Sequence, residues 1–209
     1  MLFNNFEKYF KEKKGVFHIG ANDGMERDWY KLHEFPRVLW FEPNRSIFER
    51  LCINLLEYPN NTAYCLGVHD TLKTATLHIA SNKGLSSSIL EFGTHKRYRP
   101  DIKFIRHEVI NLVRMDDFIR DNNLNMDDFN FLNIDVQGVE LNVIKSFGDL
   151  IAKFAYIYTE INEEELYKEG CLVREIDKYL GLYGFKRAMT HMTPYKWGDA
   201  LYVKKDLVQ

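Results

Sequence analysis

The hydrophobic positions of the chain form short apolar runs that alternate with amphipathic stretches. Short apolar runs are typical of buried strands, whereas apolar residues spaced three and four apart are typical of helices. Strands are predicted over residues 16–19, 38–41, 63–68, 130–134 and 155–160. Helices are predicted over residues 26–35, 46–56, 116–122 and 139–147. The alternation predicts an α/β fold in which helices cover both faces of a parallel sheet.

Two regions depart from this alternation. Residues 74–80 and 107–113 alternate polar with apolar positions, which predicts added strands near the third strand. Toward the end, a predicted helix over 173–183 precedes two apolar runs, 185–189 and 200–203, joined by a loop of about ten residues. Strands this close in sequence pair antiparallel. The sheet is therefore expected to be mostly parallel, with a C-terminal antiparallel hairpin.

Length and composition narrow the class of protein. The 209 residues predict a single domain over 1–209. Phe3, Phe6 and Phe10 share one helical face, which predicts a helix over 1–14 packed on that domain. No apolar run reaches the ~18 residues of a membrane span, and the N-terminus lacks a signal-peptide core. Three widely spaced cysteines indicate neither a disulfide framework nor a zinc site, so we expect a cytoplasmic protein.

Charge restricts the partners. A formal net charge of −2 excludes a global positive field that would attract nucleic acid or anionic lipid. Residues 94–107 nevertheless concentrate five Lys and Arg residues with a single Asp, and Arg97 among them is a candidate substrate contact. This segment is either a solvated basic loop or a contact to phosphate, on a nucleotide-linked or lipid-linked sugar or on RNA. Because aromatic residues are sparse in it, we do not expect a nucleic-acid platform.

The first predicted strand ends in a glycine-containing turn, "HIGANDG", at residues 18–24. Ligands of open α/β sheets bind beyond the carboxyl ends of the strands, and Glu42, which ends the second strand, suits ribose hydroxyls. Asn22 replaces the middle glycine of the dinucleotide fingerprint, and the adjacent Asp23 disfavours a pyrophosphate but suits a cation. S-adenosylmethionine, cationic and free of phosphate, therefore fits better than a dinucleotide. A plain connecting turn is the alternative.

A second polar group follows the strand over 130–134. Asp135 ends this strand, where it can orient a cofactor, bind a metal or accept a proton, and Gln137 offers both a donor and an acceptor. The next strand ends in Glu160 and Asn162, which alternation places on one side. Asp135, Glu160 and Asn162 are thus candidate ligands of Mg²⁺ or Mn²⁺. Ordinary strand-end polarity is the alternative.

Two predicted loops carry candidate acceptor contacts. The hairpin loop, "THMTPYKWGD", carries His191 as a candidate base and Tyr195 and Trp197 as candidate surfaces for a sugar ring. We expect this loop to hang over the edge of the sheet that carries the glycine turn, although local aromatic packing is equally open. The polar loop over 81–89 carries Ser88, which can bond to cofactor or acceptor.

Several motifs occur together in one order: "FHIGANDG", "WFEPN", "LGVHD" followed by "TATLHIA", "LSSSIL", "VRMDDFI", "NIDVQGVELNVIKSF" and "YIYTEIN". From about residue 15 to residue 204 the chain resembles the FkbM-type methyltransferases, and the segment that begins "NIDVQGVE" is the most specific part. The resemblance implies a seven-stranded Rossmann-like three-layer sandwich with S-adenosylmethionine as the methyl donor. It also implies O-methylation of hydroxyls on sugars, glycolipids or natural products.

The resemblance further implies roles for individual positions. The methionine portion of the cofactor would be held by Gly20, Ala21, Asn22, Asp23 and Gly24, and the ribose by Glu42. Pro43 and Asn44, which follow Glu42, are further cofactor-binding candidates. The adenine would lie near Gly67 and Val68, and Asp135 would lie next to the transferred methyl. One position departs, because the family usually carries an acid two residues before the first glycine and this chain has His18. If that acid binds the cofactor's ammonium group, another residue must do so, and Asp23 is the candidate.

Four functions are weighed on these grounds. The first is O-methylation of a sugar or glycan beside glycosyltransferases of the same pathway, with Asp135, Glu160 or His191 as the base. The second is methylation of RNA or protein, which predicts a continuous positive groove made by the basic segment. The third is a non-catalytic S-adenosylmethionine-binding module, which the intact acids disfavour. The fourth, an NAD-dependent oxidoreductase, is disfavoured by the missing glycine of the first turn.

Overall fold

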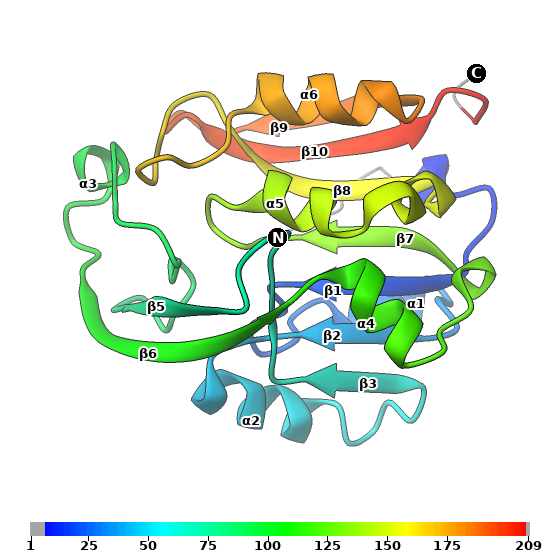
Figure 1. Ribbon diagram of the computed structural model, residues 1–209, viewed down its shortest axis with the longest axis horizontal. Helices are drawn as coiled ribbons and strands as arrows, with labels where there is room; N and C mark the ends of the chain where they lie inside the picture. The colour runs from blue at the N-terminus through cyan, green and yellow to red at the C-terminus, as the bar shows by residue number, and fades with distance from the viewer. Residues whose placement is uncertain (1–6, 208–209) are drawn as a thin grey trace.

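The computed structural model describes residues 7–207, which build a seven-stranded sheet and a smaller second sheet. The large sheet has the order β3-β2-β1-β7-β8-β10-β9. Its strands are β1 (Gly15–Ile19), β2 (Val38–Phe41), β3 (Asn61–Tyr64), β7 (Phe129–Ile134), β8 (Tyr156–Asn162), β9 (Phe185–Met192) and β10 (Trp197–Lys204). Neighbours from β3 to β8 pair in parallel, and β10 runs antiparallel to β8 and β9. The carboxyl ends of the parallel strands therefore share one edge, on the left of Figure 1.

Helices cover both faces of this sheet. The covering helices are α1 (Arg27–Leu32), α2 (Arg45–Asn54), α4 (Met115–Asp121), α5 (Glu140–Ser146) and α6 (Val173–Leu182). The short helix α3 (His95–Tyr98) lies beyond the carboxyl edge of the sheet, at the left of Figure 1. The 3-10 turns are η1 (Glu7–Tyr9), η2 (Met126–Asp128) and η3 (Gly148–Lys153). Alternation along β1 sends Phe17 and Ile19 into the core that α4, α5 and α6 cover, and Val16 into the core beneath α1 and α2. Helices α4, α5 and α6 lie in front of the sheet in Figure 1. The predicted three-layer sandwich with a C-terminal antiparallel hairpin is confirmed.

The added strands form the second sheet. Its members are β4 (Gly67–Val68), β5 (Thr74–Ala80) and β6 (Phe104–Val113), in the order β4-β6-β5. The prediction of one strand over 63–68 was wrong, because β3 ends at Tyr64 and the chain resumes as β4 in the other sheet. Gly67 makes this crossing possible, since a Cβ there would lie 2.5 Å from a methyl carbon of Leu112.

The predicted N-terminal helix over 1–14 is not observed where the structure describes it. Residues 1–6, with Phe3 and Phe6, lie outside the described residues, and only the turn η1 is helical between residues 7 and 14. Phe10 is buried, with its ring centroid 5.0 Å from that of Phe131 and 4.5 Å from that of Tyr156. This aromatic contact attaches the segment to the sheet without a helix.

The terminal hairpin is longer than predicted and its loop is shorter. Strand β9 extends to Met192 and β10 begins at Trp197, so the connection is residues 193–196 rather than about ten residues. Gly198 lets the strands approach, since a Cβ there would lie 2.1 Å from the carbonyl oxygen of His191. His191 and Trp197 are therefore strand residues. None of the helices among residues 7–207 has the length and apolar character needed to cross a membrane.

Candidate active site

The turn between β1 and α1 is clamped between the ends of β2 and β7. Gly20 has a φ of +82°, and a Cβ at this position would lie 1.8 Å from the carbonyl oxygen of Asp135. The N–H groups of Gly20 and Ala21 both donate to the carbonyl of Phe41, at 2.9 and 3.0 Å. Only glycine fits this combination of backbone conformation and close contact.

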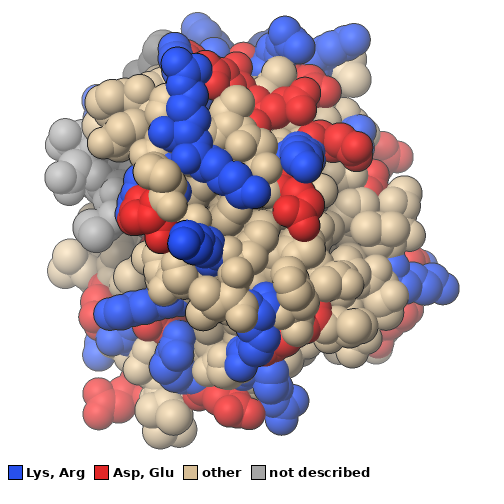
Figure 2. Space-filling model, turned by 90° about the vertical axis from the view of Figure 1, so that its left-hand side faces the viewer, with Lys and Arg blue, Asp and Glu red and all other residues tan. Residues whose placement is uncertain are grey.

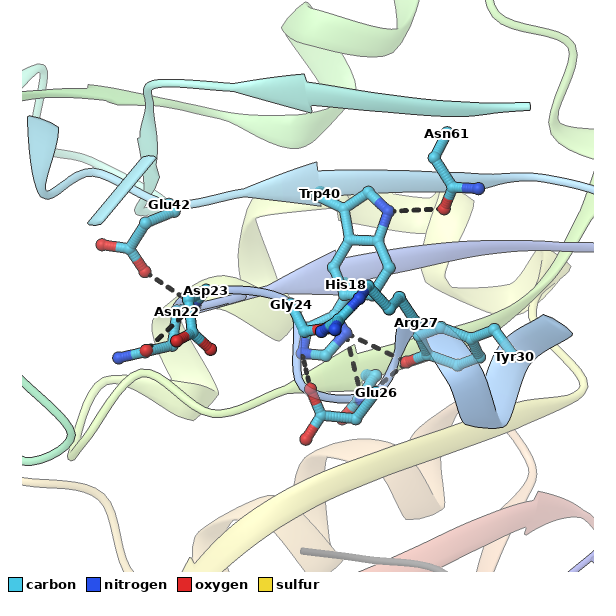
Figure 3. Close-up of polar contacts among 11 residues, drawn as sticks. His18, Asn22, Asp23, Gly24, Glu26, Arg27, Tyr30, Trp40, Glu42 and Asn61 are labelled. Atoms are coloured by element: carbon cyan, nitrogen blue, oxygen red, sulfur yellow. Dashed lines mark hydrogen bonds and ion pairs between the residues drawn. The ribbon is translucent and has the colours of Figure 1, made fainter. Parts of the chain in front are cut away.

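Glu42 follows β2 and faces this turn (Figure 3). Its Oε2 accepts a hydrogen bond from the N–H of Asn22 at 2.9 Å, and its Oε1 accepts one from the N–H of Asn44 at 2.8 Å. Burial of the side chain raises the pKa of this carboxyl to about 7. Because each oxygen keeps a further lone pair, the fixed carboxylate can accept two more hydroxyl donors.

A cleft, termed the cofactor cleft below, opens at the carboxyl ends of β1, β2 and β7. One part of its lining is apolar and includes Phe41, Val68, Leu77, Ile110 and Leu112. Another part carries the carboxyl groups of Glu26, Glu42, Asp135 and Asp199. Three of the apolar residues come from β5 and β6, so the second sheet forms one wall of the cleft.

Most of the predicted cofactor residues line this cleft. They are His18, Gly20, Ala21, Asn22, Glu42, Pro43, Gly67, Val68, Asp135 and Gln137. The lining does not include Asp23, Gly24, Asn44 or Ser88. Asn44 instead caps α2 by accepting hydrogen bonds from the N–H groups of Ser46 and Ile47, and Ser88 donates to the carbonyl of Gln137 at 2.7 Å. These two side chains therefore hold the backbone next to the cleft rather than line it.

His18 belongs to a buried polar cluster beneath the cleft (Figure 3). Its Nδ1 lies 3.0 Å from the hydroxyl of Tyr30, and its ring stacks on Trp40 with centroids 4.8 Å apart. Its Nε2 lies 4.0 Å from Oε2 of Glu26. Burial lowers the pKa of His18 to about 3, so the ring is neutral at neutral pH. A neutral imidazole cannot replace the carboxylate that the resemblance predicts at this position.

Carboxyl groups crowd the polar part of the cleft. Burial raises the pKa of Glu26 and of Asp199. Asp135 is accessible through the cleft, and loss of hydration together with the charge of Asp199 raises its pKa as well. Among residues 7–207, no Lys or Arg side chain lines the cleft. The cleft is therefore suited to a ligand that carries positive charge.

Gln137 joins the two predicted catalytic acids. Its Nε2 donates to Oδ1 of Asp135 at 2.5 Å and to Oε2 of Glu160 at 2.7 Å, and its Oε1 accepts from the hydroxyl of Tyr167 at 2.7 Å. Burial, followed by the charge of Asp135, raises the pKa of Glu160. Burial and the neighbouring acids thus make Glu160 a stronger base than an isolated carboxylate, and the hydrogen bond from Gln137 partly opposes this.

The predicted metal ligands do not form a metal site in this arrangement. An amide nitrogen, which is not a metal ligand, lies between Asp135 and Glu160. Asn162 is buried, and its Oδ1 has no hydrogen-bond partner among the described residues. Residues 7–207 contain no group of three His, Cys, Asp or Glu side chains placed to hold a metal ion.

A second cavity adjoins the cofactor cleft, and Leu85 and Gln137 line both. Of the predicted substrate contacts, Trp197 lines this cavity. The ring of Tyr195 stacks on the ring of Trp197, with centroids 5.1 Å apart. Arg97 is exposed, with its guanidinium 5.9 Å from the ring centroid of Tyr98, and Arg99 lines the cavity in its place. His191 is exposed on β9 and pairs with Asp199 on β10.

Glu26 and Asp199 are site residues that sequence reasoning missed. Asp199 could have been found from the hairpin register. In a strand that starts at Trp197, alternation sends the side chains of Trp197 and Asp199 to the same face. Glu26 carries no comparable signal, since it precedes α1 in the same loop as Asp23. His95 and Tyr167 also line the second cavity. They reach it only because the segment between β4 and α4, termed the insertion, packs against the segment that follows β8.

The strand order, the glycine turn after β1 and the acid that follows β2 define a class I, Rossmann-like methyltransferase fold. Residues 18–187 match the model of the methyltransferase FkbM domain. The chain belongs to this family of S-adenosylmethionine-dependent methyltransferases.

One curated relative and two solved structures illustrate the likeness. The chain is 26% identical over 168 residues to the 2-O-methyltransferase NoeI of Sinorhizobium fredii (strain NBRC 101917 / NGR234). The aligned region covers 77% of this chain and 68% of that protein. The fold is similar to that of a ribosomal protein L11 methylase from Lactobacillus delbrueckii subsp. bulgaricus, at 10% identity and a TM-score of 0.51, covering 95% of this chain and 74% of that chain. The fold is also similar to that of TrmK of M. capricolum in complex with S-adenosyl-homocysteine, at 7% identity and a TM-score of 0.51. That match covers 95% of this chain and 66% of the TrmK chain.

Proposed function

We propose that this protein is an S-adenosylmethionine-dependent O-methyltransferase that acts on a hydroxyl of a sugar or glycan. The observation that carries the proposal is the junction at Gln137. On one side lies an acidic cleft suited to a cation, and on the other lies Glu160, a half-buried carboxyl group that lines a second cavity. A methyl donor and a hydroxyl acceptor would meet at this junction.

The residues of the cleft fit the cofactor part by part. The apolar wall from β5 and β6 suits adenine, and the Glu42 carboxylate, already fixed by two backbone N–H groups, suits the ribose hydroxyls. Glu26, Asp135 and Asp199 would face the sulfonium and ammonium groups. Loss of hydration raises their pKa values, and a bound cation would favour their charged forms.

The chemistry needs a base because a sugar hydroxyl is a poor nucleophile at neutral pH. When bound, S-adenosylmethionine supplies an electrophilic methyl group, whose bond to sulfur breaks with its electron pair on sulfur as the new C–O bond forms. Glu160 accepts the hydroxyl proton. Gln137 holds Glu160 and Asp135 in fixed positions, which limits reorganisation during the transfer.

Transfer to oxygen is supported by the relative that is named a 2-O-methyltransferase. The RNA alternative draws less support from the surface at the carboxyl edge, where Figure 2 shows Lys and Arg side chains interleaved with Asp and Glu. Within the basic segment, Arg99 is paired with Asp101 at 2.8 Å, and Arg106 is paired with Glu108. A pathway role beside glycosyltransferases follows from the proposed acceptor.

Two measurements test the proposal in sequence. Calorimetric titration of the protein with S-adenosylhomocysteine tests the cofactor, and micromolar binding is expected. Incubation with S-adenosylmethionine and a panel of glycans, read by mass spectrometry, then tests the reaction through a gain of one methyl group on the glycan. Cofactor binding without methylation of any glycan, alongside methylation of an RNA or protein added in parallel, would overturn the assignment of the acceptor.

A further inference from the structure

The second cavity is termed the acceptor chamber. Its lining comprises Leu85, Ser86, His95, Arg99, Gln137, Glu160, Leu166, Tyr167 and Trp197. These residues come from the loops after β5 and β7, from α3 and the residue after it, from β8 and the segment that follows it, and from the start of β10. The chamber is thus built where the insertion between β4 and α4 packs against the carboxyl edge of the large sheet.

His95 lines this chamber with a largely buried imidazole ring. The side chain is 4% exposed, yet its Nδ1 has no hydrogen-bond partner among the described residues. Its ring stacks on Phe92, with centroids 4.4 Å apart and planes 9° apart. Burial lowers the pKa of His95, so the ring is neutral and has one donor and one acceptor nitrogen. An unpartnered buried polar group is costly, so a partner for this nitrogen would be favourable. Because the atom itself is covered, the ring must turn toward the chamber for a ligand hydroxyl to reach it.

The charges of the chamber favour a neutral occupant. Arg99 is the cationic side chain of the lining, and its Nε and Nη2 bind both carboxylate oxygens of Asp101, at 3.0 and 2.8 Å. Glu160 places an acid at the opposite end, next to Gln137. An anionic ligand would meet an arginine already paired with Asp101 and a carboxyl group at Glu160, so neither end offers it an unpaired positive charge.

An aromatic surface borders the same chamber. Trp197 lies in the lining, with its ring 5.1 Å from that of Tyr195 and 6.3 Å from that of Tyr98. The ring of His95 is nearly parallel to that of Trp197, at 19° and 6.1 Å. Flat aromatic faces beside hydroxyl-binding groups match a ring with one C–H face and a polar edge.

We propose that the acceptor chamber binds a neutral polyhydroxylated ring, such as an uncharged pyranose, against Trp197. One hydroxyl of the ring bonds to the imidazole of His95, and the hydroxyl to be methylated bonds to Glu160 beside Gln137. This assignment rests on the proposed function for the reacting hydroxyl. His95 then selects which hydroxyl reaches Glu160, because fixing one hydroxyl fixes the rotation of the ring.

The test is ligand-observed NMR on the protein saturated with S-adenosylhomocysteine. The probes are the methyl glycopyranosides of glucose, galactose and mannose, with methyl glucuronide as the charged comparison and cyclohexanol as a ring that lacks a second hydroxyl. Binding is read by saturation transfer to the ring protons and by the ¹⁵N shift of the His95 imidazole. We expect at least one neutral glycoside to bind and to shift that signal, with methyl glucuronide and cyclohexanol weaker.

The variant His95→Phe keeps an aromatic ring against Phe92 but removes the nitrogen. It should bind S-adenosylhomocysteine as the wild type does and bind the glycoside about tenfold more weakly, the loss expected for one hydrogen bond. The matched control is His33→Phe, at a histidine that stacks on Trp29 at 4.2 Å and lies outside the chamber lining. This control should leave both affinities unchanged.

The outcomes separate the chamber assignment from the proposed function. Binding of S-adenosylhomocysteine without binding of any neutral glycoside, preferential binding of the glucuronide, or equal glycoside affinity of His95→Phe and wild type would each overturn the chamber assignment alone. Absence of S-adenosylhomocysteine binding would overturn the proposed function and the chamber assignment with it. Loss of both affinities in His95→Phe would mean a folding defect, and Trp197→Leu then repeats the comparison from the other wall.

Discussion

Glu160 on β8 and Asp199 on β10 are direct register partners, so their carboxyl groups leave the same face of the sheet. Asp199 raises the pKa of Glu160, after the larger effects of burial and of the neighbouring acids. The hairpin therefore contributes an acid to the cofactor cleft as well as a wall to the acceptor chamber. Through Asp199, the hairpin also supplies the cofactor cleft with an acidic side chain, which the neutral His18 does not provide.

Asp199→Asn is expected to weaken binding of S-adenosylhomocysteine by about tenfold, because the ammonium group loses a carboxylate partner. Affinity for 5′-methylthioadenosine, which has the adenine and ribose but no ammonium group, should stay within twofold of wild type. Calorimetry with both ligands checks this, with Asp121→Asn on the exposed surface as the control. Equal losses for the two ligands would place Asp199 away from the ammonium group.

Glu42→Ala is expected to weaken both ligands, by about a hundredfold, because the ribose loses two hydrogen bonds to a charged group. The contrast with Asp199→Asn separates the ribose contact from the ammonium contact. The same calorimetric titrations apply, with Glu49→Ala on the exposed face of α2 as the matched control. Retention of methylthioadenosine affinity in Glu42→Ala would contradict the ribose assignment.

Ribose binding is expected to depend on pH. The pKa of Glu42 is raised to about 7, so the carboxyl is charged at pH 8 and largely protonated at pH 6. A protonated carboxyl is a weaker acceptor, and the affinity for 5′-methylthioadenosine should fall as the pH is lowered through about 7. Glu42→Gln, which does not titrate, should bind weakly with little change over the same range. A pH-independent affinity of the wild type would show that another group holds the ribose.

Local patterns predicted the elements whose residues carry their own signal. The strand "FNFLNI" is buried at every position because β7 lies between β1 and β8, and its apolar residues Phe129, Phe131, Leu132 and Ile134 already indicated a buried strand. Gly20 was recognisable from the glycine turn that follows its own strand, and Glu42 from its place at the end of the next strand. In each of these cases the signal lies within one strand, or one strand with its turn.

Features that depend on contacts between distant segments were not predictable in this way. The division of residues 63–68 between two sheets depends on Leu112, which packs where a Cβ of Gly67 would be. The chamber lining of His95 and Tyr167 depends on the insertion folding back onto the sheet. The length of the hairpin was missed because polar residues such as Thr190 and His191 lie on a strand that alternation alone did not extend.

Glu160→Gln is expected to lower the rate of methyl transfer by about a hundredfold or more, because the hydroxyl loses its base. Binding of S-adenosylhomocysteine should change by less than twofold, since Glu160 lines the acceptor chamber and not the cofactor cleft. Single-turnover assays on the identified glycan measure the rate. Glu163→Gln, at an exposed acid paired with Lys196, is the control. An unchanged rate in Glu160→Gln would transfer the role of base to Asp135 or His191.

His18→Gln is expected to make the protein less sensitive to acid. The folded-state pKa of His18 is about 3 against an ordinary value of 6.5, so between these values only the unfolded chain binds the proton. Stability is therefore lost as the pH falls below 6.5, by about 2 kcal/mol at pH 5 from this residue. Raised carboxyl pKa values act in the opposite direction, but they are common to wild type and variant. The glutamine oxygen can take over the contact with the Tyr30 hydroxyl. Urea unfolding at pH 7.5 and pH 5 should show the wild type losing more stability than the variant, and equal losses would mean that His18 is protonated in the folded state.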